Sequence, residues 1–464
     1  MNDIDRLNRS HLSLRAGCRL LYHRQTTSVL SHCHDLSSHS AGTIVLIPTR
    51  RDRQAVEENR LVGSNGLDRR GFGIILLSRL ALNMQMRVIY PFLPAISRGL
   101  GVPLQTTSLI LTARAVANLS SPLFGALSDR FGRRALMVTG LLILTSGTLL
   151  VALAPSFGAV VAAVAFLSLS KAVYDPAVLA YLGDAVPYER RGRMMGILAM
   201  MWPASWFIGV PVAGFLIDAF NWRAPFLFIG ALSVLSLGLM LRRRSVGASP
   251  ASYRPAHGYQ HLQVRASLRQ HVGGVSRQAW YAVLVSLLLV LATENVYIVY
   301  GAWLEEQFAL SIMALGLVSI VVGAAELTAE GASAGWVDRI GKRRAIMIGL
   351  FCNGLAYLLL PHLAVNLFGA LLGLFLVYLT FDFSIVSLFP LLSELAPEAR
   401  GTLMALNVAA MAVGRLVSSL TAARLWLASG LAANTAVSAA AVFLALVVLA
   451  GLIQERRPEV EVAP

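Results

Sequence analysis

Carboxylate side chains interrupt several long apolar stretches of this chain, and they are its clearest candidates for chemistry. They are Asp175, Glu294, Asp382, Glu326 and Glu330. Because apolar surroundings favour the neutral form of an unpaired carboxyl group, each is a candidate proton carrier. Asp175 ranks first because Lys171, one helical turn earlier, can stabilise its anion and is released when Asp175 binds a proton. Glu294 ranks second because it lies near the middle of its apolar stretch.

Basic, amide and aromatic side chains occur in the same stretches at helical spacing. Along residues 79–90, polar side chains recur after four, four and three residues, so one helix would present them on one face. Polar stripes of this kind are expected on the walls of a water-filled cavity. The residues predicted to line that cavity are Arg87, Tyr90, Arg114, Asn118, Lys171, Tyr174, Trp206, Tyr297, Tyr378 and Arg415.

The two halves of the chain differ in the sign of these charges. Arg79, Arg87, Arg114 and Lys171 make the first half mostly basic, whereas the carboxylates make the second half mostly acidic. A charge at the bilayer centre costs roughly 2.5–3.5 kcal/mol on insertion scales, so we expect pairing across the interface between the halves. For any one of these residues, a static ion pair is the alternative to a role in transport.

The composition indicates which kind of structural element holds these residues in place. Hydrophobic residues make up 56% of the 464 residues and charged residues only 14%, whereas a soluble domain carries about a quarter charged residues. The apolar residues form stretches of about twenty, the length of a membrane-spanning helix. The expected spans are 72–97, 105–127, 135–154, 157–182, 194–217, 224–241, 279–301, 311–335, 344–361, 364–390, 402–424 and 431–453.

A short motif that occurs twice indicates an internal duplication. Residues 129–134 read DRFGRR, and residues 338–343, which lie 209 positions later, read DRIGKR. Repeats of this kind mark duplicated structural units. We therefore predict an all-α polytopic membrane protein with two pseudo-symmetric six-helix bundles and a cavity between them. The expected segments are a disordered cytoplasmic extension (1–70), a first bundle (71–241), a basic linker (242–278), a second bundle (279–453) and a tail (454–464).

The positions of the arginines predict the orientation. Basic clusters follow the second, fourth, sixth, eighth and tenth spans, and such loops stay in the cytoplasm. Both termini are then expected to be cytoplasmic in a multi-pass protein of the cell membrane. The net charge of +15 reflects these loops, so we do not expect nucleic-acid binding. In this orientation Glu326 and Glu330 are expected nearer to the cytoplasmic end of their span.

The loop after the second span carries a family signature. Residues 125–134 resemble motif A of the major facilitator superfamily, whose pattern is G-x-L-x-D-R-x-G-R-R/K. The resemblance covers residues 71–453 and implies a cytoplasmic latch that opens during transport; a turn that only sets topology is the alternative. The second copy is looser, because Gly335 lies one residue closer to Asp338. The gating residues implied are Gly125, Asp129, Arg130, Gly132, Arg133, Asp338, Arg339 and Gly341.

The fifth span contains a second, partial signature. Gly209, Pro211 and Gly214 are similar to motif C of the same superfamily, which marks proton-coupled antiporters. Val210 and Phe215 depart from that motif, because glycine is expected at both positions. The alternative is that glycine and proline simply kink this helix, as they do in many membrane helices.

These resemblances predict a function. They imply a secondary transporter, similar to bacterial drug and metabolite antiporters of the inner membrane, that exports a small amphipathic or drug-like molecule in exchange for protons. It would work as a monomer among membrane lipids. The alternatives are uptake of a small, even anionic, metabolite by proton symport, and a non-transporting receptor on the same fold.

Other classes of function are not expected. The proton gradient would supply the energy, so no cofactor is needed. Cys18, Cys33 and the histidines near them match no zinc spacing, so no metal site is predicted. Nor does the sequence place a nucleophile beside a base, which argues against an enzyme.

Overall fold

The computed structural model describes residues 69–120, 131–243, 276–396 and 400–453. These parts all belong to one compact unit, Gly63–Pro464. Nearly all of the predicted extension and tail, and most of the linker, lie outside the described residues. Three residues of the gating motif, Gly125, Asp129 and Arg130, also lie outside them.

The described part of the chain is built from helices, which confirms the predicted fold class. The helices of the first half are α3 (Arg69–Arg87), α4 (Leu93–Leu100), α5 (Leu104–Thr107), α6 (Leu109–Asn118), α8 (Arg133–Leu153), α9 (Phe157–Ala185), α10 (Tyr188–Ala199), α11 (Met201–Ala204), the π-helical turn η2 (Ser205–Gly209), α12 (Val210–Ala219) and α13 (Ala224–Arg242). The helices of the second half are α15 (Arg277–Tyr297), α16 (Tyr300–Phe308), α17 (Ile312–Ile340), α18 (Lys342–Leu363), α19 (Leu367–Leu395) and α20 (Arg400–Leu452).

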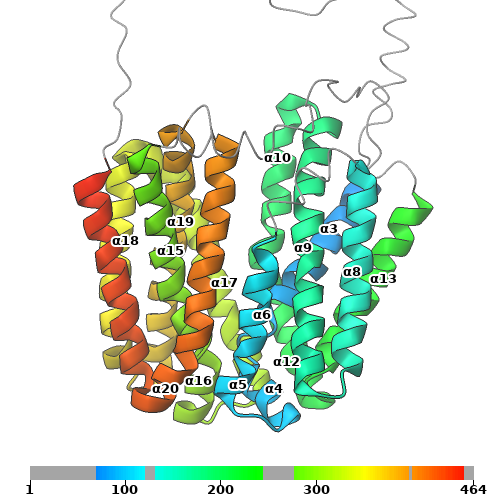
Figure 1. Ribbon diagram of the computed structural model, residues 1–464, viewed down its shortest axis with the longest axis horizontal. Coiled ribbons are helices and arrows are strands. Elements are labelled where there is room, and N and C mark those ends of the chain that lie inside the picture. The colour runs from blue at the N-terminus through cyan, green and yellow to red at the C-terminus, as the bar shows by residue number, and fades with distance from the viewer. Residues whose placement is uncertain (1–68, 121–130, 244–275, 397–399, 454–464) are drawn as a thin grey trace, which may run out of the picture. The chain divides into compact units, whose positions relative to one another are not determined.

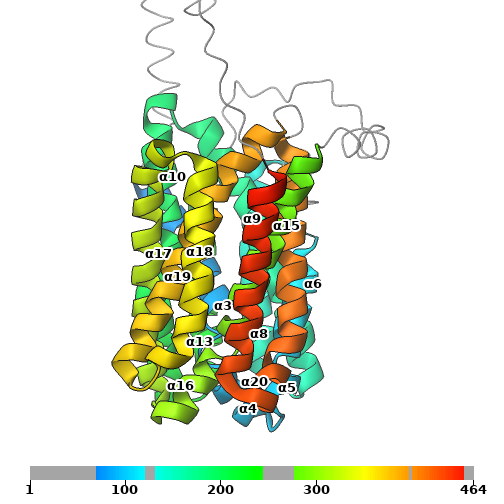
Figure 2. The same ribbon diagram turned by 90° about the vertical axis from the view of Figure 1, so that its left-hand side faces the viewer.

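Within the described residues, nine helical stretches are long and apolar enough to cross a membrane. The last stretch, Gly401–Leu452, is interrupted at Gly430, which has a non-helical φ of 68°, and α20 consists of two helical segments that run in opposite directions (Figures 1 and 2). The nine stretches therefore cover ten of the predicted spans. The first two predicted spans fall on the shorter helices α3–α6, and the second of them runs into residues 121–130. The total of twelve spans stays a prediction.

The helices form two groups that lie side by side (Figure 1). In the first group α8 packs against α9, and in the second α18 packs against α19 and α15 against α20. Glycines allow such close approaches: a Cβ on Gly140 would lie 2.8 Å from Tyr174 Cβ, between α8 and α9, and one on Gly354 would lie 2.7 Å from the Phe443 ring, between α18 and α20. A buried amide pair, Asn295 and Asn434, further joins α15 to α20.

Side-chain caps determine where several helices begin. Ser156, Ser276, Ser311 and Asn366 each precede a helix, and each accepts a hydrogen bond from the backbone N–H three residues later. Such caps satisfy a donor that the first helical turn leaves free. Ser156 and Asn366 start α9 and α19, the corresponding helices of the two halves, so the duplication extends to the helix starts.

The two bundles meet closely at the face that carries α4, α5 and α16, at the bottom of Figure 1. Arg98 on α4 forms an ion pair with Glu305 on α16 at 2.7 Å. Gly214 on α12 faces Gly316 on α17, where an added Cβ would lie 3.2 Å from the opposite Cα. Ser108 Oγ donates to the Ser419 carbonyl at 3.0 Å. Main chains and side chains thus seal this face.

Candidate functional site

A cavity of about 470 Å³ lies between the two bundles, a size that suits a small molecule. Its apolar wall comes from both bundles and includes Met86, Leu179, Val290, Val408 and Ala412. The residues predicted from the sequence that line it are Arg87, Tyr90, Asn118, Lys171, Asp175, Glu294, Tyr297, Glu326, Asp382 and Arg415.

Arg87 joins the two bundles inside this cavity. It lies at the end of α3, and its Nη2 donates to both carboxylate oxygens of Glu326 on α17, at 2.7 and 2.9 Å. Both side chains are almost fully buried, at 7% and 4% exposure. The ion pair is charge-assisted, and removal of either partner would leave a buried charge unpaired. The structure thus pairs charges across the interface, as the sequence predicts.

Two tryptophans hold the Arg87 guanidinium in place. Its carbon lies 3.9 Å from the ring centroid of Trp202 and 4.4 Å from that of Trp206, distances at which a cation is attracted to an aromatic face. The indole N–H of Trp206 also donates to Glu326 at 2.9 Å. Trp206 is buried behind the cavity and does not line it, whereas Trp202 does.

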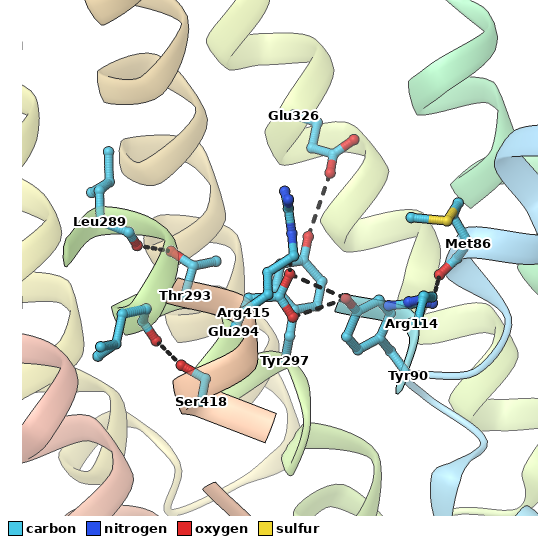
Figure 3. Close-up of polar contacts among 11 residues, drawn as sticks. Met86, Tyr90, Arg114, Leu289, Thr293, Glu294, Tyr297, Glu326, Arg415 and Ser418 are labelled. Atoms are coloured by element: carbon cyan, nitrogen blue, oxygen red, sulfur yellow. Dashed lines mark hydrogen bonds and ion pairs between the residues drawn. The ribbon is translucent and has the colours of Figure 1, made fainter. Parts of the chain in front are cut away.

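A second group of contacts centres on Glu294 of α15 (Figure 3). Tyr90, from the first bundle, donates its hydroxyl to Glu294 at 2.8 Å, and Arg415 of α20 donates from Nε at 3.0 Å. Arg114 lies behind Tyr90, with its guanidinium carbon 4.7 Å from the ring centroid. Arg114 also donates to the Met86 carbonyl at 2.8 Å. Arg114 therefore supports Tyr90 and does not itself line the cavity.

Asp175 belongs to a group that lies wholly within the first bundle. One of its oxygens pairs with Arg79 and the other with Lys171, each at 2.8 Å. Lys171 also donates to Asn83 at 2.7 Å. Both oxygens of Asp175 therefore already contact a cation from the same bundle. Its role as first proton carrier stays a prediction, and this geometry favours the interface carboxylates over it.

The remaining predicted carboxylates lie on the second bundle in different surroundings. Asp382 of α19 lines the cavity, and its Oδ2 is buried without a hydrogen-bond partner among the described residues. Glu330 is half-buried on α17 and is not among the lining residues. Glu326, which the sequence predicts nearer to the cytoplasmic end of its span, lies near the middle of α17 and lines the cavity. It meets Arg87 in the cavity wall because α17 continues for 29 residues, beyond the predicted end of the span.

Aromatic rings pack around Tyr297 at the second-bundle side of the cavity. The centroid of its ring lies 4.4 Å from that of Tyr378, 5.3 Å from Tyr90 and 6.0 Å from Trp206. Its hydroxyl donates to Glu326 at 3.4 Å (Figure 3). Tyr378 and Tyr174 are fully buried and do not line the cavity. Of the predicted aromatic lining residues, Tyr90 and Tyr297 are the two that reach it.

The partial signature of the fifth span lies beside a π-helical turn. The turn covers Ser205–Gly209 and is followed by Pro211, and such turns are frequent at functional sites. A Cβ on Gly209 would lie 2.4 Å from Met84 Cγ. Gly209 therefore lets η2 pack closely against α3 within the first bundle, while Gly214 contacts α17 of the second bundle. The implied role of the signature in antiport stays a prediction.

The repeated motif makes matching contacts in the two halves. Gly132 and Gly341 have φ angles of 88° and 92°, which favour glycine. Arg133 Nε lies 3.4 Å from Asp184, at the end of α9, and Lys342 pairs with Glu394, at the end of α19. Asp338 and Arg339 are exposed. The implied latch stays a prediction, because Asp129 lies outside the described residues.

Periodicity alone did not identify some of the lining residues. Trp202, Phe381 and Thr293 line the cavity; Phe381 and Thr293 adjoin the predicted residues Asp382 and Glu294 in the sequence, but nothing in the spacing of the three separates them from packing residues. The apolar wall has no sequence signal at all, since apolar residues fill every span. Only the arrangement of the helices shows which of them face the cavity.

Comparison with known proteins shows the family. The family model described as Major Facilitator Superfamily matches residues 75–419 and, in a second match, residues 282–464. The chain is 26% identical over 381 residues to the uncharacterized MFS-type transporter YwfA of Bacillus subtilis (strain 168), which covers 80% of this chain and 91% of the relative. It is 23% identical over 351 residues to multidrug resistance protein 2 of the same organism, which covers 74% and 86%.

A solved structure has the same fold. A D-xylose-proton symporter superposes with a TM-score of 0.68 at 15% identity, which covers 83% of this chain and 97% of that one. The two-bundle arrangement, the cavity between the bundles and the sequence matches all agree. The chain belongs to the Major Facilitator Superfamily, and it is therefore a multi-pass membrane transporter and not an enzyme.

Proposed function

We propose that this protein exports a small amphipathic or drug-like molecule in exchange for protons. The observation that carries the proposal is the buried Arg87–Glu326 ion pair, which ties the two bundles together within the cavity. A proton bound to Glu326 would neutralise its carboxylate and weaken the ion pair with Arg87. Because the attraction between buried charges is large, proton binding there would shift the balance between conformations in which the bundles meet at different faces.

Glu294 gives the proposal a second proton-sensitive contact between the bundles. Its carboxylate accepts from Tyr90 of the first bundle and from Arg415 of the second. Protonation would weaken the bonds from both Tyr90 and Arg415, because a neutral carboxyl group is a weaker acceptor than a carboxylate. Two carboxylates of the second bundle thus contact the first bundle within the cavity. We assign the coupling of protons to bundle movement to this pair, Glu294 and Glu326.

Export is supported by the wall of the cavity and by one relative. The wall is mainly apolar and aromatic, which suits an amphipathic molecule. The relative from Bacillus subtilis is named a multidrug resistance protein. In the orientation predicted from the arginines, the sealed face with α4, α5 and α16 would be extracellular. Close contact of the bundles on the extracellular side is what we expect of a state that takes its substrate from the cytoplasm, as an exporter does.

Uptake by proton symport is the second candidate. The observation that favours it is the cation-rich group of the first bundle, in which Arg79 and Lys171 share one carboxylate, Asp175. Such a group could hold an anionic metabolite. Symport and antiport differ in the direction in which substrate moves when a proton gradient is imposed, so one assay separates them.

The test is flux in proteoliposomes that contain the purified full-length chain. Antiport predicts that an imposed pH gradient drives the substrate against the direction of proton flow, and symport predicts movement with it. Glu326→Gln should abolish gradient-driven accumulation but keep exchange of substrate across the membrane without a gradient. Glu306→Gln, the same substitution at an exposed position on α16, is the matched control. Unchanged accumulation by Glu326→Gln would remove Glu326 from the mechanism.

A further inference from the structure

A break between α3 and α4 carries two of the contacts that the first bundle makes with the second. The helix α3 ends at Arg87, and α4 begins at Leu93. Between them lies Pro91, which has no backbone N–H to give to the Arg87 carbonyl. That carbonyl instead accepts from the N–H of Tyr90 at 3.3 Å. In a continuous helix the N–H of Tyr90 would bond to Met86, so the break leaves the Met86 carbonyl without a helical partner.

Arg114 of α6 takes the place of that missing donor (Figure 3). Its Nη1 donates to the Met86 carbonyl at 2.8 Å, and its guanidinium carbon lies 4.7 Å from the centroid of the Tyr90 ring. The residue is only 3% exposed, and no carboxylate of the described residues forms an ion pair with it. A buried cation needs compensating contacts, and here a carbonyl and a ring of the break supply them.

Tyr90 depends on Arg114 more than Arg87 does. Arg87 is held within its own bundle by the rings of two tryptophans. The ring of Tyr90 has Arg114 behind it, whereas its other close ring contact, Tyr297 at 5.3 Å, belongs to the second bundle. The Tyr90 hydroxyl donates to both carboxylate oxygens of Glu294, at 2.8 and 3.1 Å. Loss of Arg114 would therefore disturb the contact with Glu294 first.

The second bundle packs closely against the same break. A Cβ on Gly301 of α16 would lie 2.3 Å from the Pro91 carbonyl oxygen. The break is thus enclosed between α16 of the second bundle and Arg114 of the first. Because packed interfaces switch between discrete arrangements, a displaced break changes how the two bundles meet.

We propose that Arg114 is a positioning residue for proton coupling, which acts through Tyr90 to keep the Glu294 contact between the bundles. This inference rests on the proposed function, because it takes that contact to be proton-sensitive. Arginine suits the role because its planar fork donates to a carbonyl while its face lies against a ring. Arg114→Lys keeps the charge but has a single donor group, so it cannot make both contacts. The conformer in which the bundles meet at α4, α5 and α16 then loses part of its stabilisation.

The test measures how the bundles meet, without any ligand. Spin labels are attached at Gln105→Cys on α5 and Glu306→Cys on α16, two exposed positions on opposite bundles, after the three native cysteines are replaced by serine. Pulsed electron resonance on the full-length protein in nanodiscs then gives the ratio of separated to closed bundles at this face. We expect Arg114→Lys to raise that ratio about tenfold, because a hydrogen bond to a carboxylate is weakened. An unchanged ratio for folded Arg114→Lys protein would overturn the proposal.

Tyr90→Phe shows whether Arg114 acts through the tyrosine hydroxyl. This variant keeps the ring, and with it the contact of Arg114, but removes the donor to Glu294. It should raise the ratio by a similar factor, and the double variant Arg114→Lys/Tyr90→Phe should raise it no further. Effects that multiply in the double variant would mean that Arg114 acts by another route, and the proposal would be wrong. Should Arg114→Lys fail to fold, an unchanged ratio for Tyr90→Phe alone would still refute it.

Arg223 provides the matched control. It makes the same two kinds of contact, since its Nη2 donates to the Ala154 carbonyl at 2.7 Å and its guanidinium carbon lies 4.9 Å from the centroid of the Trp222 ring. Trp222, however, packs against Phe226 of its own bundle. Arg223→Lys should therefore leave the ratio unchanged. A rise equal to that of Arg114→Lys would contradict the particular role assigned to Arg114.

Failure of this inference is distinguishable from failure of the proposed function. If Glu326→Gln removes gradient-driven accumulation but Arg114→Lys leaves the ratio unchanged, the antiport proposal stands and the positioning role fails. If Arg114→Lys and Tyr90→Phe raise the ratio without adding to each other, but no pH gradient drives the substrate, the positioning role stands and antiport fails.

Discussion

The two halves of this protein share a repeated motif but use their buried charges differently. In the first half, Asp175 is held by Arg79 and Lys171 of the same bundle. In the second half, Glu326 and Glu294 contact Arg87 and Tyr90 of the opposite bundle. The contacts of a carboxylate that is paired within one bundle do not change when the bundles move apart, whereas the contacts of a carboxylate at the interface do. The two halves therefore have similar helical architecture, but among the described residues only the buried carboxylates of the second half contact the opposite bundle.

Removing Arg87 should have the largest effect. Arg87→Leu leaves Glu326 buried without its cation, and such a loss costs about 3–5 kcal/mol of stability. We expect a lower midpoint of thermal unfolding and a loss of gradient-driven transport in proteoliposomes. The double variant Arg87→Leu/Glu326→Leu should recover stability but not transport, because the charges are gone but the packing is kept. If transport survives in either variant, the interface pair does not couple the bundles.

Enlarging Gly214 should have the next largest effect on transport. Gly214→Leu would push α12 away from Gly316 on α17, where even a Cβ would lie only 3.2 Å from the opposite Cα. The bundles could then no longer seal this face, and we expect the initial transport rate to fall about tenfold, since packed interfaces switch between discrete arrangements. Gly238→Leu, at a glycine with open space around it, is the control. An unchanged rate for Gly214→Leu would show that this crossing does not seal the face.

Neutralising Asp175 should affect stability more than coupling. Asp175→Asn leaves Arg79 and Lys171 close together without their shared anion, which should lower the free energy of unfolding by about 2 kcal/mol. Protein that remains folded should still couple substrate to the pH gradient. Thermal unfolding and flux measured on the same preparation test this. If Asp175→Asn has normal stability but no longer couples substrate transport to the pH gradient, then Asp175, and not the interface carboxylates, is the first proton carrier.

The smallest effects are expected where the halves are most alike. Arg134 donates to the carbonyls of Met240 and Arg243 at the end of α13, and Arg343 donates to that of Ala450 near the end of α20. Each bond satisfies a carbonyl that a helix end leaves free. Replacing either arginine by alanine should cost about 1 kcal/mol, and the two losses should be similar. A loss confined to one half would show that the two copies of the motif have different roles.

Much of the fold could be predicted from the sequence because it depends on short-range patterns. Apolar stretches of bilayer length specify membrane helices wherever the chain folds, and the motif repeated at residues 129 and 338 reveals the duplication. Helical spacing also grouped residues 79–90 on one helix. The structure divides that group, because Arg79 and Asn83 contact α9, whereas Arg87 and Tyr90 contact the second bundle.

What the sequence by itself determined is which residues had to find partners: every charge inside an apolar span, since none can remain alone in lipid. Which partner each one found was decided only by the tertiary structure. Periodicity specifies a face of one helix, but it carries no information on which helix lies opposite or at what height. For that reason Glu326 could not be placed beside Arg87 from the sequence, and Arg114 could not be placed behind Tyr90.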